Sequence, residues 1–86
     1  MSRVCGSAGA AEHVEECIKN IMIQIREGGE DLRCTANEVI SNADEMTAEL
    51  VQIQTQTALS VAEAALHQLQ ISKQDFAQYA ELIRSL

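Results

Sequence analysis

Glycine and proline interrupt helices, and this chain contains almost none of either beyond its first ten residues. The 86-residue sequence has no proline, and the Gly28-Gly29 pair holds the only glycines after Ala10. One Phe, one Tyr and no Trp leave Ile, Leu, Val, Met and Ala as the main apolar side chains, a composition typical of packed helices. The sequence therefore predicts an all-α fold with the glycine pair as its main interruption.

The periodicity of apolar residues indicates what the glycine pair does. Before the pair, apolar residues recur at helical spacing at Val14, Ile18, Ile21 and Ile25. The same rhythm carried past Ile25 meets polar residues, whereas a count restarted at Leu32 follows a mostly apolar line as far as Ala64. Such a change of phase is expected where a chain reverses direction. Gly28 and Gly29 are therefore predicted to form the hinge of a helical hairpin, with Gly28 capping the first helix.

Capping patterns suggest where the helices begin. The tetrads Ser41-x-x-Asp44 and Ser72-x-x-Asp75 both match a capping box. Ser72 is favoured as a new start because Phe76 is spaced to close a hydrophobic staple, and a break near residues 41–44 is left open. We expect one helical domain of residues 10–86 after a flexible tail of residues 1–9, with helices over 10–27, 31–70 and a short third one over 72–85.

The long central segment carries apolar residues on two sides. Leu59 and Leu66 lie on a line rotated from that of Leu50, and a two-sided apolar helix needs more than one neighbour. Oligomerisation or a helical partner is therefore expected to complete a bundle with coiled-coil packing. Phe76 and Tyr79 are interpreted first as core anchors and otherwise as a binding hot spot. The interface candidates are Leu50, Ile53, Leu59, Val61, Leu66, Leu69, Phe76, Tyr79 and Ile83.

Charge is strongly acidic and unevenly spread. The formal net charge is −7, and residues 12–49 carry ten acidic against three basic groups, whereas residues 50–72 carry a single charge. This balance argues against nucleic-acid binding and attachment to anionic membranes. The chain has no apolar run of about 18 residues, so membrane insertion is not expected. The first nine residues lack a signal-peptide pattern, and we expect a cytoplasmic protein or one exported without a cleaved signal peptide.

Residues able to perform chemistry are few and scattered. Cys5, Cys17 and Cys34 show no C-x-x-C spacing, and His13 and His67 lie far apart in the chain. No nucleophile, paired-carboxylate or phosphate-binding motif accompanies them. No catalytic, cofactor-binding or metal residues are predicted, and the chain is expected not to be an enzyme. Whether Cys34 is a reactive thiol stays open.

A short, acidic helical hairpin resembles in size and shape the small proteins exported by type VII secretion systems. Their Trp-x-Gly hinge corresponds here to residues 27–29, which lack the Trp. Their C-terminal signal, an aromatic residue followed four positions later by an acid, is also missing, because Phe76 precedes Ala80 at that spacing and Tyr79 is likewise followed by an apolar residue. The resemblance implies a shared architecture, and no functional residue is carried over from it.

The leading expectation is a non-enzymatic helical protein–protein interaction module that self-associates or pairs with another helical protein. Three alternatives stay open: an accessory or cargo-binding subunit of a secretion system, an acidic inhibitor of a basic groove, and a thiol or metal sensor. The sensor would use Cys34 with Cys17 or His67. Binding that weakens steeply with salt would favour the inhibitor, and reactive thiols or bound metal would favour the sensor.

Overall fold

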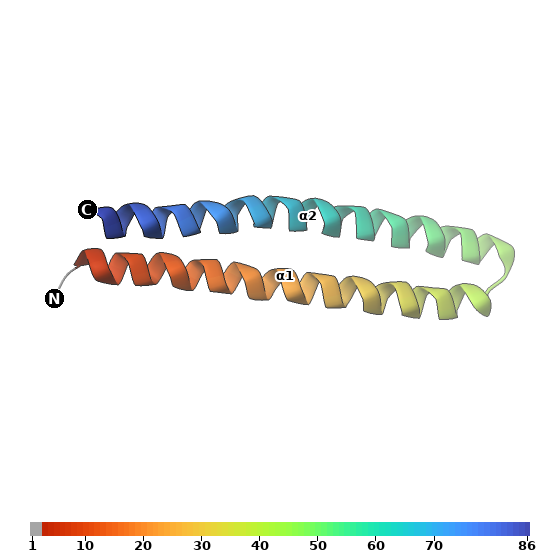
Figure 1. Cartoon of the computed structure of the whole chain (residues 1–86). Helices are drawn as coiled ribbons and strands as arrows, with labels where there is room; N and C mark the ends of the chain where they lie inside the picture. The colour runs from red at the N-terminus through yellow and green to blue at the C-terminus, as the bar shows by residue number, and fades with distance from the viewer. Residues whose placement is uncertain (1–2) are drawn as a thin grey trace.

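The computed structural model describes residues 3–86, which form two long helices joined by a short turn. Helix α1 spans Arg3–Ser41 and helix α2 spans Glu45–Ser85. They lie antiparallel along a rod of 65 × 16 × 11 Å, with the start of α1 beside the end of α2 (Figure 1). Residues 3–86 contain no strand, so the predicted all-α helical hairpin is confirmed. The place of the reversal and the number of helices differ from the prediction.

The predicted N-terminal tail is largely helical. Helix α1 begins at Arg3, so residues 3–9 belong to it, while residues 1–2 lie outside the described part of the chain. Ala8 and Ala11 are 3% and 8% exposed, which shows that the helix packs on α2 almost from its start. Small residues that looked like a tail therefore allow a close approach of two helices.

The chain reverses at residues 42–44, the place that the sequence left open. The side-chain amide of Asn42 donates to the backbone oxygen of Glu38 over 2.9 Å and so satisfies the end of α1. The carboxylate of Asp44 accepts the backbone N–H of Thr47 over 2.7 Å, and Asp44 has the extended backbone of an N-cap. Short polar side chains thus replace the helical hydrogen bonds lost on both sides of the turn.

The predicted hinge at Gly28 and Gly29 is wrong, because both glycines lie inside the continuous helix α1. No glycine among the described residues has a positive φ. A Cβ added to Gly29 would meet the Leu59 side chain of α2 at 3.6 Å, so this glycine faces the other helix. Each glycine costs a helix about 1 kcal/mol relative to alanine. Packing on α2 along the whole of α1 offsets that cost.

The apolar face of α1 keeps its phase through the glycine pair. Met22 and Ala36 are 3% and 6% exposed, and Gly29 lies midway between them, seven residues from each. This spacing is the heptad repeat of a coiled coil. The heptad line through Ile21 and Gly28, one position earlier, continues into the polar residues Thr35 and Asn42. The predicted change of phase is wrong for that reason.

The predicted third helix is also wrong, since α2 runs without a break through Ser72 to Ser85. The central helix predicted over 31–70 is instead divided by the turn at 42–44. Ile71 remains 40% exposed rather than stapled to Phe76. The capping box at Ser72 forms no boundary because nothing nearby favours a turn, and an unbroken helix keeps its backbone hydrogen bonds and its packing on α1.

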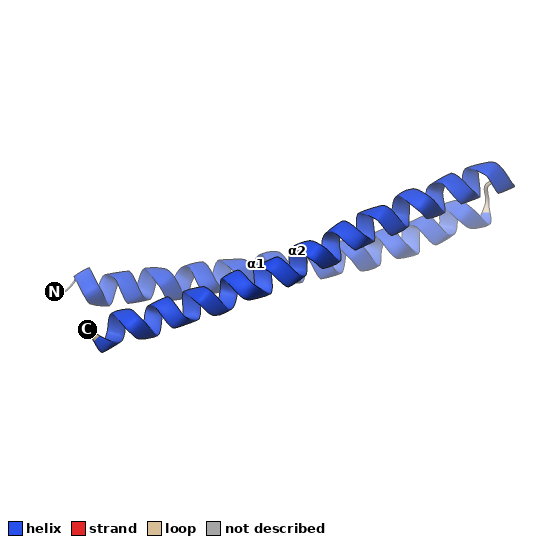
Figure 2. Cartoon of the chain, turned by 90° about the horizontal axis from the view of Figure 1, so that it is seen from above, coloured by secondary structure: helices blue, strands red, loops and turns tan. Residues whose placement is uncertain are grey.

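The two helices share a narrow seam and cross at a shallow angle when viewed from above (Figure 2), as coiled-coil helices do. Residues of α2 that are half-buried recur at three- and four-residue intervals and include Leu59, Ala62, Leu66, Leu69, Phe76 and Ile83. The side chains described from residue 8 onward include five buried apolar residues, namely Ala8, Ala11, Met22, Ala36 and Ala80. Four of these five are alanine, so the core of the single chain is small.

Candidate functional site

The side of α2 turned away from α1 is largely apolar. Met46, Leu50, Ile53 and Val61 are 73%, 57%, 57% and 65% exposed, and Ile71 is 40% exposed. Helical spacing places them on one line together with Thr57, Ser60, Ala64 and Gln68, opposite the seam residues. We call this line, from Met46 to Ile71, the outer face of α2.

Charged residues avoid the outer face. Between Met46 and Gln74 the only formal charges are those of Glu49, Glu63 and Lys73. Lys73 falls on the heptad line of the seam and is half-buried. Glu63 lines the groove between the helices, and Glu49, fourteen residues earlier, shares its flank. The outermost side of an antiparallel helix pair is normally its most polar one, so an uncharged and apolar outer face needs a separate explanation.

The whole molecule exposes more surface than a compact protein of its size. The chain of 9.4 kDa has an accessible surface of 6365 Å². A compact monomer of that mass exposes about 5,000 Å². The excess arises because a rod 16 × 11 Å in cross-section has no interior beyond a single seam. A second helical layer on the outer face would supply the missing interior.

The predicted interface residues divide between two places. Leu59, Leu66, Leu69, Phe76 and Ile83 are half-buried on the seam side of α2, whereas Leu50, Ile53, Val61 and Tyr79 are exposed. The ring of Tyr79 packs edge-on against that of Phe76, with centroids 5.4 Å apart. Sequence reasoning did not include Met46, Ile71 or Leu82, which is 63% exposed, among the interface residues. Continuing the spacing of Leu50 and Ile53 in both directions would have found the first two.

A shallow groove crosses the seam beside the glycine pair. It has a volume of about 340 Å³, with Gly29, Ile25 and Leu66 among its lining residues. Its charged residues include Arg33, which forms an ion pair with Glu30 on the same helix. The described residues contain no buried side-chain polar atom without a partner. The groove therefore follows from the missing side chain of Gly29 and carries no group poised for chemistry.

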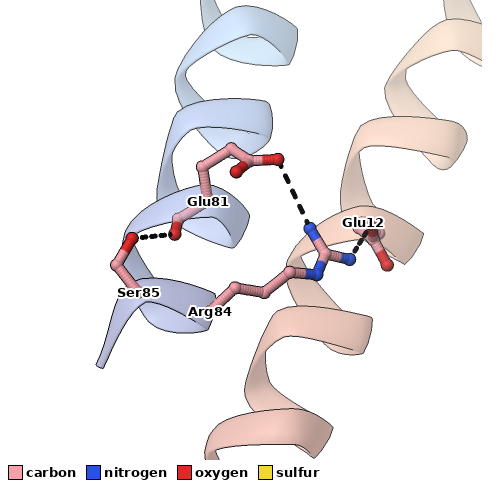
Figure 3. A network of polar contacts seen from close by, with 4 residues as sticks. All are labelled: Glu12, Glu81, Arg84 and Ser85. Carbon is pink, nitrogen blue, oxygen red and sulfur yellow. Dashed lines mark hydrogen bonds and ion pairs between the residues drawn. The ribbon is translucent and has the colours of Figure 1, made fainter.

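Polar contacts at the open end of the hairpin tie the helices together. The Arg84 guanidinium on α2 donates to the carboxylate of Glu12 on α1 and lies 3.7 Å from Glu81 (Figure 3). The side chains of Arg84 and Glu12 are 44% and 49% exposed, so solvent screens this pair. It helps to set the register of the helices and contributes little to stability.

The residues proposed for a thiol or metal sensor are not brought together into one cluster. The Cys17 sulfur lies 3.6 Å from Nε2 of His13, one turn away on α1. Cys34 lies about 26 Å farther along the same helix, at a rise of 1.5 Å per residue. Both cysteines are free and exposed. Among the described residues, no three His, Cys, Asp or Glu side chains are grouped so as to hold a metal ion.

The pKa of Asp44 is shifted by its place at the start of α2. The backbone N–H of Thr47, and after it the Thr47 side chain, hydrogen-bonds the Asp44 carboxylate and lowers the pKa of Asp44 below its usual value of 3.8. This shift belongs to the helix cap at the turn. It is not a sign of acid–base chemistry.

Neither helix of the described chain contains an apolar stretch long enough to cross a bilayer. Comparison with protein-family models, with curated protein sequences and with solved structures found no match.

Proposed function

We propose that this chain is a non-enzymatic helical interaction module that docks a second helical surface on the outer face of α2. The observation that carries the proposal is the exposure of Leu50, Ile53 and Val61, each more than half exposed on the side of α2 opposite α1. Isolated apolar residues on a surface are ordinary, whereas a line of them along a helix is typical of helix packing. A self-associating chain and a different helical partner would both satisfy this surface.

The physical gain comes from apolar area. Each large aliphatic side chain removed from water contributes about 1.5–3 kcal/mol when fully buried. Several such residues on one line are enough to offset the cost of associating two proteins. Because Met46–Gln74 carries no charge on this side, docking removes no carboxylate or ammonium group from water.

Site-specific photocrosslinking in the native cell tests the proposal. A photoreactive residue at Ile53 is expected to form covalent adducts with a helical protein, either another copy of the chain or a different one. The matched control carries the same residue at Asn20, which is exposed on the side of α1 away from α2. Adducts from position 53 and none from position 20 support the outer face as the docking surface.

A second variant shows whether the adducts depend on the apolar character of the face. With the photoreactive residue moved to Val61, an added Ile53→Glu change is expected to remove the adducts, because docking would then bury a carboxylate. Helicity by circular dichroism should stay unchanged, since Ile53 is 57% exposed in the single chain. Equal adduct yields from positions 53 and 20, or adducts insensitive to Ile53→Glu, would contradict the proposal.

A further inference from the structure

We infer that the occupant of the outer face is a second copy of this chain, with α2 packed antiparallel on α2 about a two-fold axis near Ser60 and Val61. This inference rests on the proposed function and names the partner. Three features of the chain support it: the distribution of its charge, the pairing of its outer face with a reversed copy and the amount of surface that it exposes.

The acidic groups favour a self-complex in which α1 lies outermost. Residues 12–38 of α1 carry seven acidic and three basic groups, whereas the outer face of α2 carries none. Docking α2 on α2 places the two acidic helices on opposite sides of a four-helix layer. The charges of the two α1 helices then stay in water and far apart, so the acidic groups of α1 do not prevent association.

The outer face of α2 can be paired with the same face of a reversed copy. The segment from Met46 to Gln74 carries the charges of Glu49, Glu63 and Lys73 off this face, and its midpoint is Ser60. A two-fold axis beside this midpoint pairs Leu50 of one copy with Ile71 of the other and Thr57 with Ala64, at the centre of the face. The same register sets Ile53 opposite Gln68 and, at the edge of the complex, Met46 opposite Asp75. The paired segments extend for about 42 Å of helix at 1.5 Å per residue.

The turn favours the antiparallel over the parallel arrangement. Asp44, Glu45 and Glu49 form an acidic group at the start of α2. A parallel pair would bring these groups from both copies side by side, and like charges at close range repel. An antiparallel pair places them at opposite ends of the complex and also opposes the two helix dipoles.

The exposed area is sufficient for a stable dimer. The chain exposes 6365 Å², which exceeds the value for a compact monomer of its mass by about 1,400 Å². A standard protein interface buries about 800 Å² on each partner. A dimer through the outer face can therefore form from the surface that the elongated shape leaves uncovered.

Cysteine crosslinking of the full-length chain tests both the partner and the direction. In a background with Cys5→Ser, Cys17→Ser and Cys34→Ser, Val61→Cys lies next to the axis and is expected to oxidise to a disulfide-linked dimer. Leu50→Cys alone is expected to stay monomeric in denaturing gels, because its own counterpart lies about 30 Å away. A mixture of Leu50→Cys and Ile71→Cys chains is expected to form the mixed disulfide.

Controls separate specific pairing from random oxidation. Asn20→Cys on the outer side of α1 should give no dimer under the same conditions. Leu50→Cys chains that crosslink to each other as readily as to Ile71→Cys chains would show a parallel pair and overturn the arrangement. Unaltered helicity by circular dichroism confirms that each variant is folded.

Sedimentation equilibrium measures the association itself. The unmodified chain is expected to be dimeric at about 100 μM, and Ile53→Glu should raise the dimer dissociation constant about 100-fold or more, because each dimer buries two carboxylates. A folded monomer at that concentration would overturn the second copy as the occupant. If the chain is monomeric but position 53 still crosslinks to a different helical protein in the cell, the proposed docking function stands and only the dimer is wrong. A monomeric chain that also gives no specific adduct contradicts both the dimer and the proposed function.

Discussion

Asp44 is the residue on which the start of α2 depends. Its carboxylate accepts the Thr47 N–H, and this bond lowers the pKa of Asp44 below 3.8. The cap therefore stabilises the folded chain at pH values above about 3.8, and this contribution is lost as the pH falls through the lowered pKa. We predict that Asp44→Ala lowers the melting temperature at pH 7, whereas Asp44→Ser, which retains a capping oxygen, lowers it less.

The pH dependence of that difference checks the cause. Thermal unfolding by circular dichroism between pH 7 and pH 2 should show the gap between Asp44 and Asp44→Ser closing below about pH 3.8. A gap that is the same at pH 2 and pH 7 would mean that the ionised carboxylate is not the capping group.

Gly28 and Gly29 are expected to weaken the helix rather than to bend it. An added Cβ at Gly28 meets nothing within 4 Å, and one at Gly29 meets Leu59 at 3.6 Å, an ordinary contact. We predict that Gly28→Ala and Gly29→Ala each raise the free energy of unfolding by about 1 kcal/mol. Urea denaturation at one fixed protein concentration measures the effect. Ala58→Gly, at an exposed position of α2, is the reverse control and should lower the free energy of unfolding by about 1 kcal/mol. If the glycine pair were a hinge, either alanine variant would instead be less stable than the unmodified chain.

At the scale of the helix, the continuity of α2 through Ser72 can be tested by one substitution. A true N-cap serine contributes about 1 kcal/mol, whereas a serine inside a helix is somewhat worse than alanine. We predict that Ser72→Ala leaves stability unchanged or raises it by up to about 0.5 kcal/mol. Urea denaturation is the measurement, and a loss of about 1 kcal/mol would indicate that a helix begins there after all.

The seam between the helices depends on few large side chains, and Met22 is the largest that is buried. We predict that Met22→Ala lowers the free energy of unfolding by about 2 kcal/mol. This value is at the low end of the range for buried Met→Ala substitutions, because side chains in a seam open to solvent on two sides can move to fill part of the cavity. Ile23→Ala is the matched control, since Ile23 is 41% exposed, and its effect should be under about 1 kcal/mol. Similar losses for the two variants would mean that α1 packs on α2 through another face.

At the scale of the whole molecule, association through an uncharged face should resist salt. We predict that raising NaCl from about 50 mM to about 500 mM leaves the dimer dissociation constant unchanged or lowers it, because screening weakens repulsion between the acidic α1 helices. Sedimentation equilibrium at the two salt concentrations measures this. Dissociation of the complex by salt would instead favour an acidic surface that binds a basic partner.

Individual residues show how far the sequence alone could be followed. The lack of proline and the aliphatic composition were enough to predict the all-α fold, because they act locally on every turn of helix. The turn could not be located from sequence, since the tetrads Ser41-x-x-Asp44 and Ser72-x-x-Asp75 look alike. In the first tetrad the residue that caps α2 is the final Asp44 and not the serine that a capping box would require. Leu50, Ile53 and Val61 were recognised as interface candidates, but so were Leu59 and Leu66, which belong to the seam.

The sequence by itself determined that this chain is helical and carries two apolar lines, because propensity and periodicity are properties of neighbouring residues. The tertiary structure alone decided where it folds back and which line is covered. Gly29 stays in the helix because Leu59 of the opposite helix lies against it, a contact between residues thirty positions apart. With the seam occupied by α1, the line of Leu50, Ile53 and Val61 is the one that remains in water.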